Sequence, residues 1–476
     1  MKIGFAERDI TPVKGTERPG GYGKAFHDGK VHDPCKVRAA VLDDGREQVA
    51  LVGVDALMVP RSVVLAARAA IQAACGIAPE AVLIGASHSH SAGPVGMVEP
   101  GQFDHASPFV QRLAYELSSC ADARYTQHVL AQIIAAVQEA HDKRGEARCG
   151  VGSGIEDQAA FNRRFRMKNG LTYTHPGKGN PDIVAPAGPI DPHVGVLGAW
   201  RDGQFLGCVV NYACHATTGP GGTSADWIYY LEQTIRGVMG QDAVVVFLNG
   251  ACGDVTQVNN LSPYAIDFGE RAARYVGGRV GAEAVKVLLS MEAGELTPLA
   301  ARSQVLKIPR RRPSAERLRR DMEIASRDPQ EVGHTAWTFA KETVLLDALI
   351  AKEPMVDVEV QAVQVGPAVF LANPSEFFCQ LGLELRARSQ FPLTFPVTLA
   401  NGCVGYVPTE EAFSAHGGGY ETRLTSYSNL VVNAGTRIVE ALLKLTAELT
   451  PGQVPTPPLA PPFKAPWSYG NVPPEP

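Results

Sequence analysis

The feature that most constrains the fold is the alternation of short apolar runs with amphipathic segments along most of the chain. The apolar runs are rich in Val, Ile, Leu and Phe, as in strands of a sheet that is covered by other elements. Between them, apolar residues recur at three- and four-residue spacing, which is typical of helices with one buried face. The alternation therefore predicts an α/β fold, with a mixed β-sheet core covered by helices.

The strands predicted from these patterns span 37–42, 49–54, 82–86, 194–200, 207–213, 244–249, 301–308, 356–365, 368–372 and 395–399. The predicted helices span 61–75, 127–142, 228–239, 268–291, 315–324, 335–351, 376–389 and 436–449. Residues 91–123 and 168–192 are rich in Gly, Pro and polar residues. We expect these two stretches to be long active-site loops that act as a lid or a substrate wall.

The C-terminal stretch 451–476 contains ten prolines, so it cannot form a helix or a central strand. We expect a single large catalytic domain over residues 1–450, followed by this proline-rich tail. Trp467 and Tyr469 indicate that the tail packs on a surface, such as that of a second copy in a homo-oligomer. The alternative is a disordered end.

The composition of the chain indicates its cellular compartment and argues against some classes of binding partner. The formal net charge of −5 argues against a nucleic-acid-binding surface. None of the nine cysteines forms a CxxC pair, which is the pattern of reduced thiols in a cytoplasmic protein. Charged residues precede any apolar run at the N-terminus, so we expect no signal peptide. Apolar runs are also too short for a transmembrane helix, so we expect no membrane insertion.

Two histidines follow the predicted strand 82–86, within the sequence Ser-His-Ser-His-Ser. In extended backbone, His88 and His90 project to the same side because they are two residues apart. In α/β sheets, ligands bind in the crevice beyond the carboxyl ends of the strands. A single histidine is usually structural, but a pair ringed by serines favours a polar functional site.

A third histidine, His215, follows the predicted strand 207–213. Asp226 comes shortly after it, directly before a predicted helix. One interpretation of Asp226 is a helix N-cap. The other is an acceptor that orients a metal-bound histidine.

Three more polar segments follow or flank predicted strands, at 249–260, 371–378 and 400–409. The first carries two glycines and an aspartate in a tight turn, which makes it a candidate wall of the same crevice. The second contains Glu376 between apolar residues. Glu376 is either a first-turn residue favoured by the helix dipole or part of the site.

Together these segments resemble the ordered motifs of the neutral/alkaline ceramidase family, over about residues 1–450. The motifs are S-H-S-H-S-x-G-P, N-Y-A-C-H-A-T, N-G-A-C-G-D-V-T, N-P-S-E-F and N-G-C-V-G-Y-V-P-T, preceded by G-F-A-E-R-D-I-T-P. Five motifs in the right order are specific for the family and much less so for the substrate.

The resemblance implies a zinc ion held by His88, His215, Glu376 and Tyr406. Zn²⁺ accepts nitrogen and oxygen ligands and can keep one position open for water. A carboxylate and a phenolate would offset its charge. Tyrosine ordinarily has a pKa of about 10, so the metal must favour its deprotonation.

The resemblance also implies metal-assisted hydrolysis of an amide. His90 is suited to hydrogen-bond the developing oxyanion or to move a proton. The arginine of the family's Asn-Arg motif falls on Arg163, with Arg164 as the alternative. The other positions that we expect in the site are Thr256 as a catalytic residue and Arg164, Asp254 and Tyr420 as substrate-binding residues.

Two positions depart from the family pattern. Thr256 stands where ceramidases carry serine, and Cys403 stands where they carry another tyrosine. The family's C-terminal immunoglobulin-like domain is not seen in this sequence. We therefore expect a small, soluble N-acyl compound as the substrate.

The alternatives are a ceramide or another N-acyl lipid, an ester or lactone at the same site, and an inactive metal-binding scaffold. A deep apolar slot that ends at His88 and His215 would favour the lipid, and a short polar pocket the soluble compound.

Overall fold

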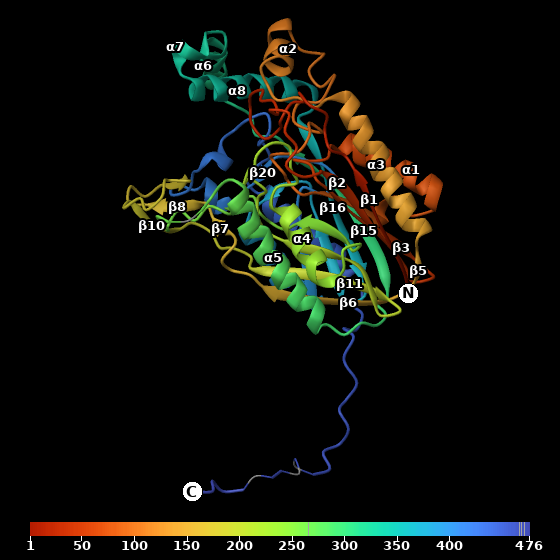
Figure 1. The fold of residues 1–476 in the computed structure, drawn as a ribbon. Helices are drawn as coiled ribbons and strands as arrows, with labels where there is room; N and C mark the ends of the chain where they lie inside the picture. Colours follow the sequence, from red (N-terminus) through yellow and green to blue (C-terminus); the bar gives the residue numbers. More distant parts are fainter. Residues whose placement is uncertain (265, 466, 468, 471) are drawn as a thin grey trace.

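The computed structural model describes residues 1–264, 266–465, 467, 469–470 and 472–476. Three large sheets dominate them (Figure 1). The first, in the order β4-β3-β2-β1-β5, comprises β1 Lys2–Asp9, β2 Lys36–Asp43, β3 Gln48–Val54, β4 Val82–Ala86 and β5 Gly145–Glu146. The second, β13-β12-β11-β6, comprises β6 Arg148–Ile155, β11 His193–Arg201, β12 Gln204–Tyr212 and β13 Val244–Asn249. The third, β15-β16-β17-β19, comprises β15 Leu299–Pro309, β16 Met355–Val365, β17 Ala368–Ala372 and β19 Leu393–Val397.

Each large sheet is antiparallel except for one parallel pair at an edge: β3 with β4, β12 with β13, and β17 with β19. The predicted mixed sheet is thus confirmed, as three sheets rather than one. Three smaller sheets are formed by short strands between the larger elements. They pair β7 Phe161–Asn162 with β14 Val255–Thr256, β18 Glu376–Phe377 with β20 Tyr406–Val407, and β8 Arg164–Met167 with both β9 Thr172–Thr174 and β10 Ile183–Pro186.

Helices cover the outer faces of the sheets, as expected for an α/β fold. The helices are α1 Arg61–Cys75, α2 Pro108–Tyr115, α3 Ala123–Asp142, α4 Trp227–Met239, α5 Glu270–Ser290, α6 Ala315–Ala325, α7 Pro329–Val332, α8 His334–Lys352, α9 Cys379–Arg388 and α10 Ala434–Ala447. Helix α3 packs on the first sheet, α5 on the second, and α9 and α10 on the third. None of the helices described combines the length and the hydropathy that are needed to cross a membrane.

The sheets pack on one another inside these helices. Strand β13 lies against β2 and β3, and the largest buried cluster joins Val52, Val246 and Phe370, one from each large sheet. At Gly53 the approach is so close that a Cβ atom would lie 2.5 Å from the Phe247 carbonyl oxygen. Polar strand ends of all three sheets are thereby brought to one region.

Helices α2 and α6–α8 form a separate small layer at the top of Figure 1, which we call the cap. Its own apolar cluster includes Phe103, Leu113 and Leu345. The prediction that residues 91–123 form a long loop is wrong in part, because helix α2 of the cap lies within this stretch. Ser107 accepts a hydrogen bond from the Val110 amide and Pro108 occupies the first turn, so α2 begins there.

Two other segments differ from the prediction. The segment 376–389 begins with strand β18, and its helix α9 starts only at Cys379. The interpretation of Glu376 as a first-turn helix residue is therefore wrong. The segment 168–192 contains β9 and β10 as well as loop.

The chain after α10 first stays on the body. Gln364 donates a hydrogen bond to the Thr450 carbonyl, and the Gly452 amide donates to Gly366. The described part of the remaining tail then runs away from the body in an extended path (Figure 1), and Leu459 and Phe463 in it are largely exposed.

Candidate metal centre

Three of the predicted ligands meet at the ends of strands from three sheets. His88 follows β4, His215 follows β12, and Glu376 lies in β18 just after β17. The Nε2 atom of His88 is 3.2 Å and that of His215 is 3.1 Å from Glu376 Oε2. All three side chains are at most 2% exposed. His88 has a left-handed backbone, with φ 66°, which is uncommon for a residue other than glycine and marks a constrained position.

Main-chain carbonyls fix the two imidazole rings. His88 Nδ1 lies 2.8 Å from the Leu57 oxygen, and His215 Nδ1 lies 2.6 Å from that of Cys252. A carbonyl only accepts, so both Nδ1 atoms carry hydrogen and, in the neutral rings, the Nε2 lone pairs face Glu376. Burial, followed by the nearby Arg163, lowers the pKa of His215 to about 4.

This arrangement fits a cation. Two imidazole nitrogens and a carboxylate oxygen converge within hydrogen-bonding distance, and each of these atoms can act as a ligand of one cation. Burial opposes the charge on Glu376, but the two histidines outweigh it and hold the pKa of Glu376 well below its usual range. Nitrogen and oxygen donors of this kind suit zinc.

His90 lies beside this group. Its Nε2 is 3.4 Å from His88 Nε2, and the ligand atoms of His88, His90 and His215 all lie within 4.8 Å of one another. His90 is therefore a further candidate ligand as well as a candidate proton carrier. Burial and the charge of His88 hold its pKa well below the ordinary value. Gly20 packs on the ring so closely that a Cβ there would lie 2.3 Å from Nδ1.

Tyrosines line the same pocket. Tyr406 in β20 pairs in register with Glu376 in β18. The Tyr420 hydroxyl donates to the Tyr406 oxygen at 2.5 Å, and the Tyr427 hydroxyl donates to Glu376 Oε1 at 2.7 Å. Burial and Glu376 hold the pKa of Tyr406 well above its usual value, so this residue is a neutral phenol unless a cation is present.

Arg163 places a fixed positive charge against the cluster. Its Nε donates to Glu421 Oε1 at 2.7 Å, its Nη2 donates to the Gly253 carbonyl at 2.9 Å, and its Nη1 lies 3.3 Å from His215 Nε2. Burial disfavours the charge, but Tyr406 and Glu421 outweigh it and hold the pKa of Arg163 well above its usual value.

Three other predicted site residues take part in loop contacts instead. The Thr256 hydroxyl accepts from the Val258 amide at 3.2 Å. Asp254 accepts from Asn162 and from the Cys379 amide, both at 2.8 Å. Arg164 donates to the Gly418 carbonyl at 2.7 Å. None of these three lines the pocket that contains His88 among the residues described, so their expected roles stay predictions.

Asp226 is the N-cap of α4, since its carboxylate accepts from the Trp227 amide and from Thr218. The residues that the sequence did not single out are Tyr22, Glu421 and Tyr427. Glu421 directly follows Tyr420 in a Gly-Gly-Tyr-Glu segment, so its polar setting was a usable signal. Nothing in the sequence marked Tyr427.

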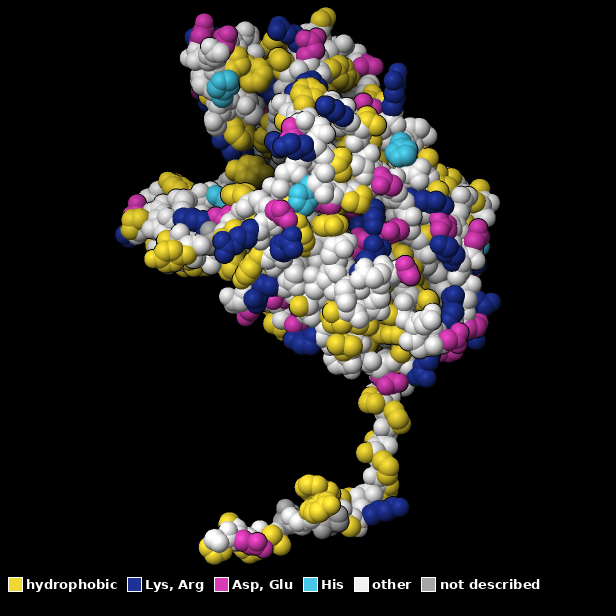
Figure 2. Space-filling model, viewed as in Figure 1, with side chains coloured by type: hydrophobic (Ala, Val, Ile, Leu, Met, Phe, Trp, Pro, Cys, Tyr) yellow, Lys and Arg dark blue, Asp and Glu magenta, His cyan; other side chains and the backbone are white. Residues whose placement is uncertain are grey.

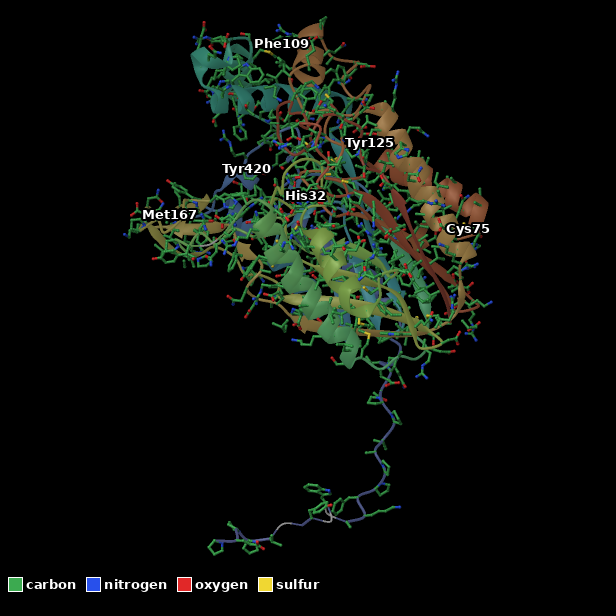
Figure 3. All side chains as sticks on the ribbon, viewed as in Figure 1. His32, Cys75, Phe109, Tyr125, Met167 and Tyr420 are labelled. Atoms are coloured by element: carbon green, nitrogen blue, oxygen red, sulfur yellow. The ribbon has the colours of Figure 1, made fainter. Side chains whose placement is uncertain are left out.

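The pocket opens beside the cap. Figure 3 labels Tyr420 between the cap and the projection formed by β8 and β10, and Figure 2 shows a hollow in the surface at this place. Tyr420 is 36% exposed, whereas His88 and Glu376 are buried. Tyr420 therefore marks the solvent-facing side of this pocket.

The protein therefore has a layered α/β fold with a candidate metal centre, which is the buried histidine–carboxylate cluster where strand ends converge. The fold itself has solved counterparts. A neutral ceramidase from Pseudomonas aeruginosa is similar with a TM-score of 0.69 at 19% identity, covering 96% of this chain and 76% of the ceramidase chain. A ceramidase complexed with C2 is similar with a TM-score of 0.68 at 18% identity, covering 97% and 77%.

No protein-family model and no curated protein matches the chain. The chain thus has the neutral ceramidase fold, and the resemblance predicted from its motifs is confirmed for the fold. At this identity the similarity defines architecture and leaves activity to be argued from the site.

Proposed function

We propose that the chain is a zinc-dependent hydrolase that cleaves the amide bond of a small, soluble N-acyl compound. The observation that carries the proposal is the convergence of His88 Nε2, His215 Nε2 and Glu376 Oε2 within 3.2 Å. The fold of the ceramidases, enzymes named for the N-acyl lipid ceramide, supports an amide as the bond that is cleaved. Tyr406, in register with Glu376, is the proposed fourth ligand.

When bound, a zinc ion would lower the pKa of a coordinated water toward about 7 and polarise the scissile carbonyl. Residues of the chain orient the ligands, stabilise developing charge and move protons. His88 and His215 are held in one tautomer by main-chain carbonyls. Arg163 sets a positive charge beside His215, where it would stabilise negative charge that develops at the cluster, and Glu421 holds its guanidinium in place.

His90 is the proposed proton carrier. It is neutral at pH 7, since burial and His88 lower its pKa, and its Nε2 faces the cluster. A neutral imidazole can accept a proton from water and pass it to the departing amine nitrogen. The Tyr420 hydroxyl, already donating to Tyr406, is available at the pocket mouth to contact the substrate.

Metal analysis and substitution test the proposal. Purified protein should contain about one zinc per chain. His88→Ala and Glu376→Ala should each lose both the metal and the hydrolysis of N-acyl substrates, whereas His128→Ala, on the exposed face of α3, should keep both. Full activity in either site variant, or no bound metal in the unsubstituted protein, would refute the assigned roles.

A substrate panel separates the alternatives. Short N-acyl amines should be cleaved faster than ceramide, since the space beside the cluster is lined by polar as well as apolar side chains. Matched esters and lactones in the same panel test whether the amide is the preferred bond. Preference for ceramide over every soluble amide would contradict the soluble-substrate part of the proposal.

A further inference from the structure

A second cavity adjoins the candidate metal centre. It shares Tyr22, Met97 and Tyr427 with the pocket around His88, and it extends beneath the cap, where Phe103 and Leu349 contribute to its wall. Its volume is about 920 Å³, counting space that is open to solvent. Half of its twenty lining residues are polar or charged, which an alkyl-chain slot would not need.

Hydrogen-bond donors gather on one part of this wall. Helix α1 begins there, at Arg61, and its N-cap residue Pro60 makes no side-chain capping bond. The first-turn amides and the positive end of the helix dipole therefore remain available to an anion. Arg310 lines the same cavity, and its Nε and Nη1 atoms donate to the Glu353 carbonyl at 2.9 Å and to Asn429 Oδ1 at 2.7 Å. Its Nη2 atom lies 3.8 Å from the exposed Glu353 carboxylate and keeps donor capacity for a ligand.

An unpartnered buried hydroxyl is the independent sign of a ligand. Ser119 lines the cavity, is 1% exposed, and its Oγ has no hydrogen-bond partner among the described residues. A buried hydroxyl left without a partner destabilises the folded protein, because it has lost its hydrogen bonds to water. An acceptor atom of a bound molecule would remove that cost.

The acidic residues of the cavity are already engaged. Glu342, 2% exposed, lies 3.0 Å from Lys341 Nζ and accepts from the Ser426 hydroxyl. Glu99 accepts from the Ser62 hydroxyl at 3.0 Å. Arg61 is likewise engaged by Glu359, but Glu359 is shared with Arg68, so two guanidinium groups face one carboxylate. The unused donors on this wall are the Ser119 hydroxyl, the Nη2 end of Arg310 and the first-turn amides of α1.

We propose that this cavity binds a carboxylate of the substrate, so that the substrate class is an N-acyl amino acid or a compound of that kind. The inference rests on the proposed function, since the scissile amide must lie at the metal centre while the carboxylate lies near Arg310, Ser119 and the start of α1. Hydrolysis breaks the C–N bond: the hydroxyl of the water joins the acyl carbon, and its other proton goes to the amine nitrogen. The products are a carboxylic acid and a free amino acid.

The first experiment compares matched substrates. A set of N-acetyl amino acids and the corresponding carboxamides is assayed with the zinc-loaded protein. The acids should have the higher kcat/KM. Arg310→Gln and Ser119→Ala should each lower kcat/KM for the acids about 10-fold or more, with a much smaller effect on the carboxamides, since a hydrogen bond to a charged group contributes about 1.5–3 kcal/mol. Arg302→Gln, at an exposed arginine on β15, is the matched control.

The second experiment separates this inference from the proposed function. His88→Ala protein, which lacks a metal ligand but leaves the cavity intact, is titrated with the same N-acetyl amino acids by calorimetry. Binding that Ser119→Ala weakens supports the carboxylate site even if no hydrolysis is ever found. Absence of binding, or hydrolysis of acids and carboxamides at equal rates by the unsubstituted protein, would overturn it. Should Arg310→Gln fail to fold, Ser119→Ala alone decides.

Discussion

The side chains that support the metal ligands matter as much as the ligands themselves. The Tyr427 hydroxyl donates to Glu376 Oε1 at 2.7 Å and so orients the carboxylate whose other oxygen faces the two histidines. Such supporting hydrogen bonds are typically worth 10- to 100-fold in metal affinity. We predict that Tyr427→Phe weakens zinc binding by about this factor.

A competition titration against a zinc chelator measures the effect of Tyr427→Phe. Tyr275→Phe, in which an exposed tyrosine on α5 loses its hydroxyl, should leave the affinity unchanged. Equal affinities for the two variants would show that the Glu376 carboxylate needs no support from Tyr427.

His215 gives the metal-free protein a pH dependence of defined sign. Its pKa is about 4 when folded, against about 6.5 when unfolded. Between these values the unfolded chain binds more protons, so the free energy of unfolding falls as the pH falls from about 6.5 to 4, by roughly 3 kcal/mol for this residue. The stabilisation is complete above about pH 6.5.

Urea denaturation of metal-free protein at several pH values in this window measures the fall. The slope should be smaller in His215→Asn, which has no titrating group at this position. If both proteins lose stability in parallel, the pKa of His215 is not displaced on folding. Zinc-loaded protein should show a steeper fall, because protonation also displaces the metal.

At this scale the sequence predicted part of the site. His88, His215 and Glu376 were identifiable because they follow apolar strands and match family motifs, although these strands belong to different sheets. The Leu57 and Cys252 carbonyls that fix the two rings carry no side-chain signal, since any residue offers a carbonyl. Asp226 illustrates the converse, because its position admitted two roles and its contacts select the N-cap.

At the scale of elements, two adjacent glycines of α5 give a matched test of packing against α4. A Cβ at Gly277 would lie 2.1 Å from the Trp227 carbonyl oxygen, whereas one at Gly278 would meet nothing within 4 Å. Alanine is favoured over glycine in a helix by about 1 kcal/mol. We predict that Gly278→Ala stabilises the protein by up to about this amount and that Gly277→Ala destabilises it, because α4 and α5 must separate.

Thermal unfolding of the two variants and the unsubstituted protein tests this prediction. Gly277→Ala should also impair the site, since Trp227 at the start of α4 donates from Nε1 to the His215 carbonyl at 3.0 Å. A rise in stability for both variants would mean that α5 can move away from α4 at no cost.

Element prediction succeeded where one physical signal dominated. The helix at 61–75 was predicted to its ends because its apolar spacing is regular, and in the structure Gly76 ends it in a left-handed conformation. It failed at 376–389, because the pairing of β18 with β20 joins segments far apart in sequence and outweighs local helix propensity at Glu376. Helix α2 was missed although Ser107 and Pro108 form a start signal, since the surrounding Gly- and Pro-rich sequence masked it.

At the scale of the whole molecule, the class of fold followed from the sequence but the stacking of three sheets did not. Stacking depends on contacts such as that of Gly53 with the Phe247 carbonyl, in which neither residue indicates its partner. The same contacts bring the strand ends of separate sheets together at the metal centre. The site is therefore a consequence of tertiary packing, and its existence was predictable from motifs only because they occur in a known order.

The tail provides the last prediction, which concerns association. Leu459, Phe463, Trp467 and Tyr469 are 98%, 81%, 78% and 80% exposed, an unusual density of apolar side chains outside the body. Burying them against a second copy would remove this area from water. We predict that the full chain forms a homo-oligomer and that a chain ending at Pro458 is a monomer.

The cut leaves the contacts of Thr450 and Gly452 with the body in place, so the truncated chain should melt within a few degrees of the full one when both are compared at low concentration. Light scattering coupled to size exclusion measures the masses, and Trp467→Ala with Phe463→Ala in the full chain serves as a milder version of the cut. An identical mass for all three proteins would remove the tail from any role in association. If the mass falls with the cut but not with the two substitutions, tail residues other than Phe463 and Trp467 make the contact between copies.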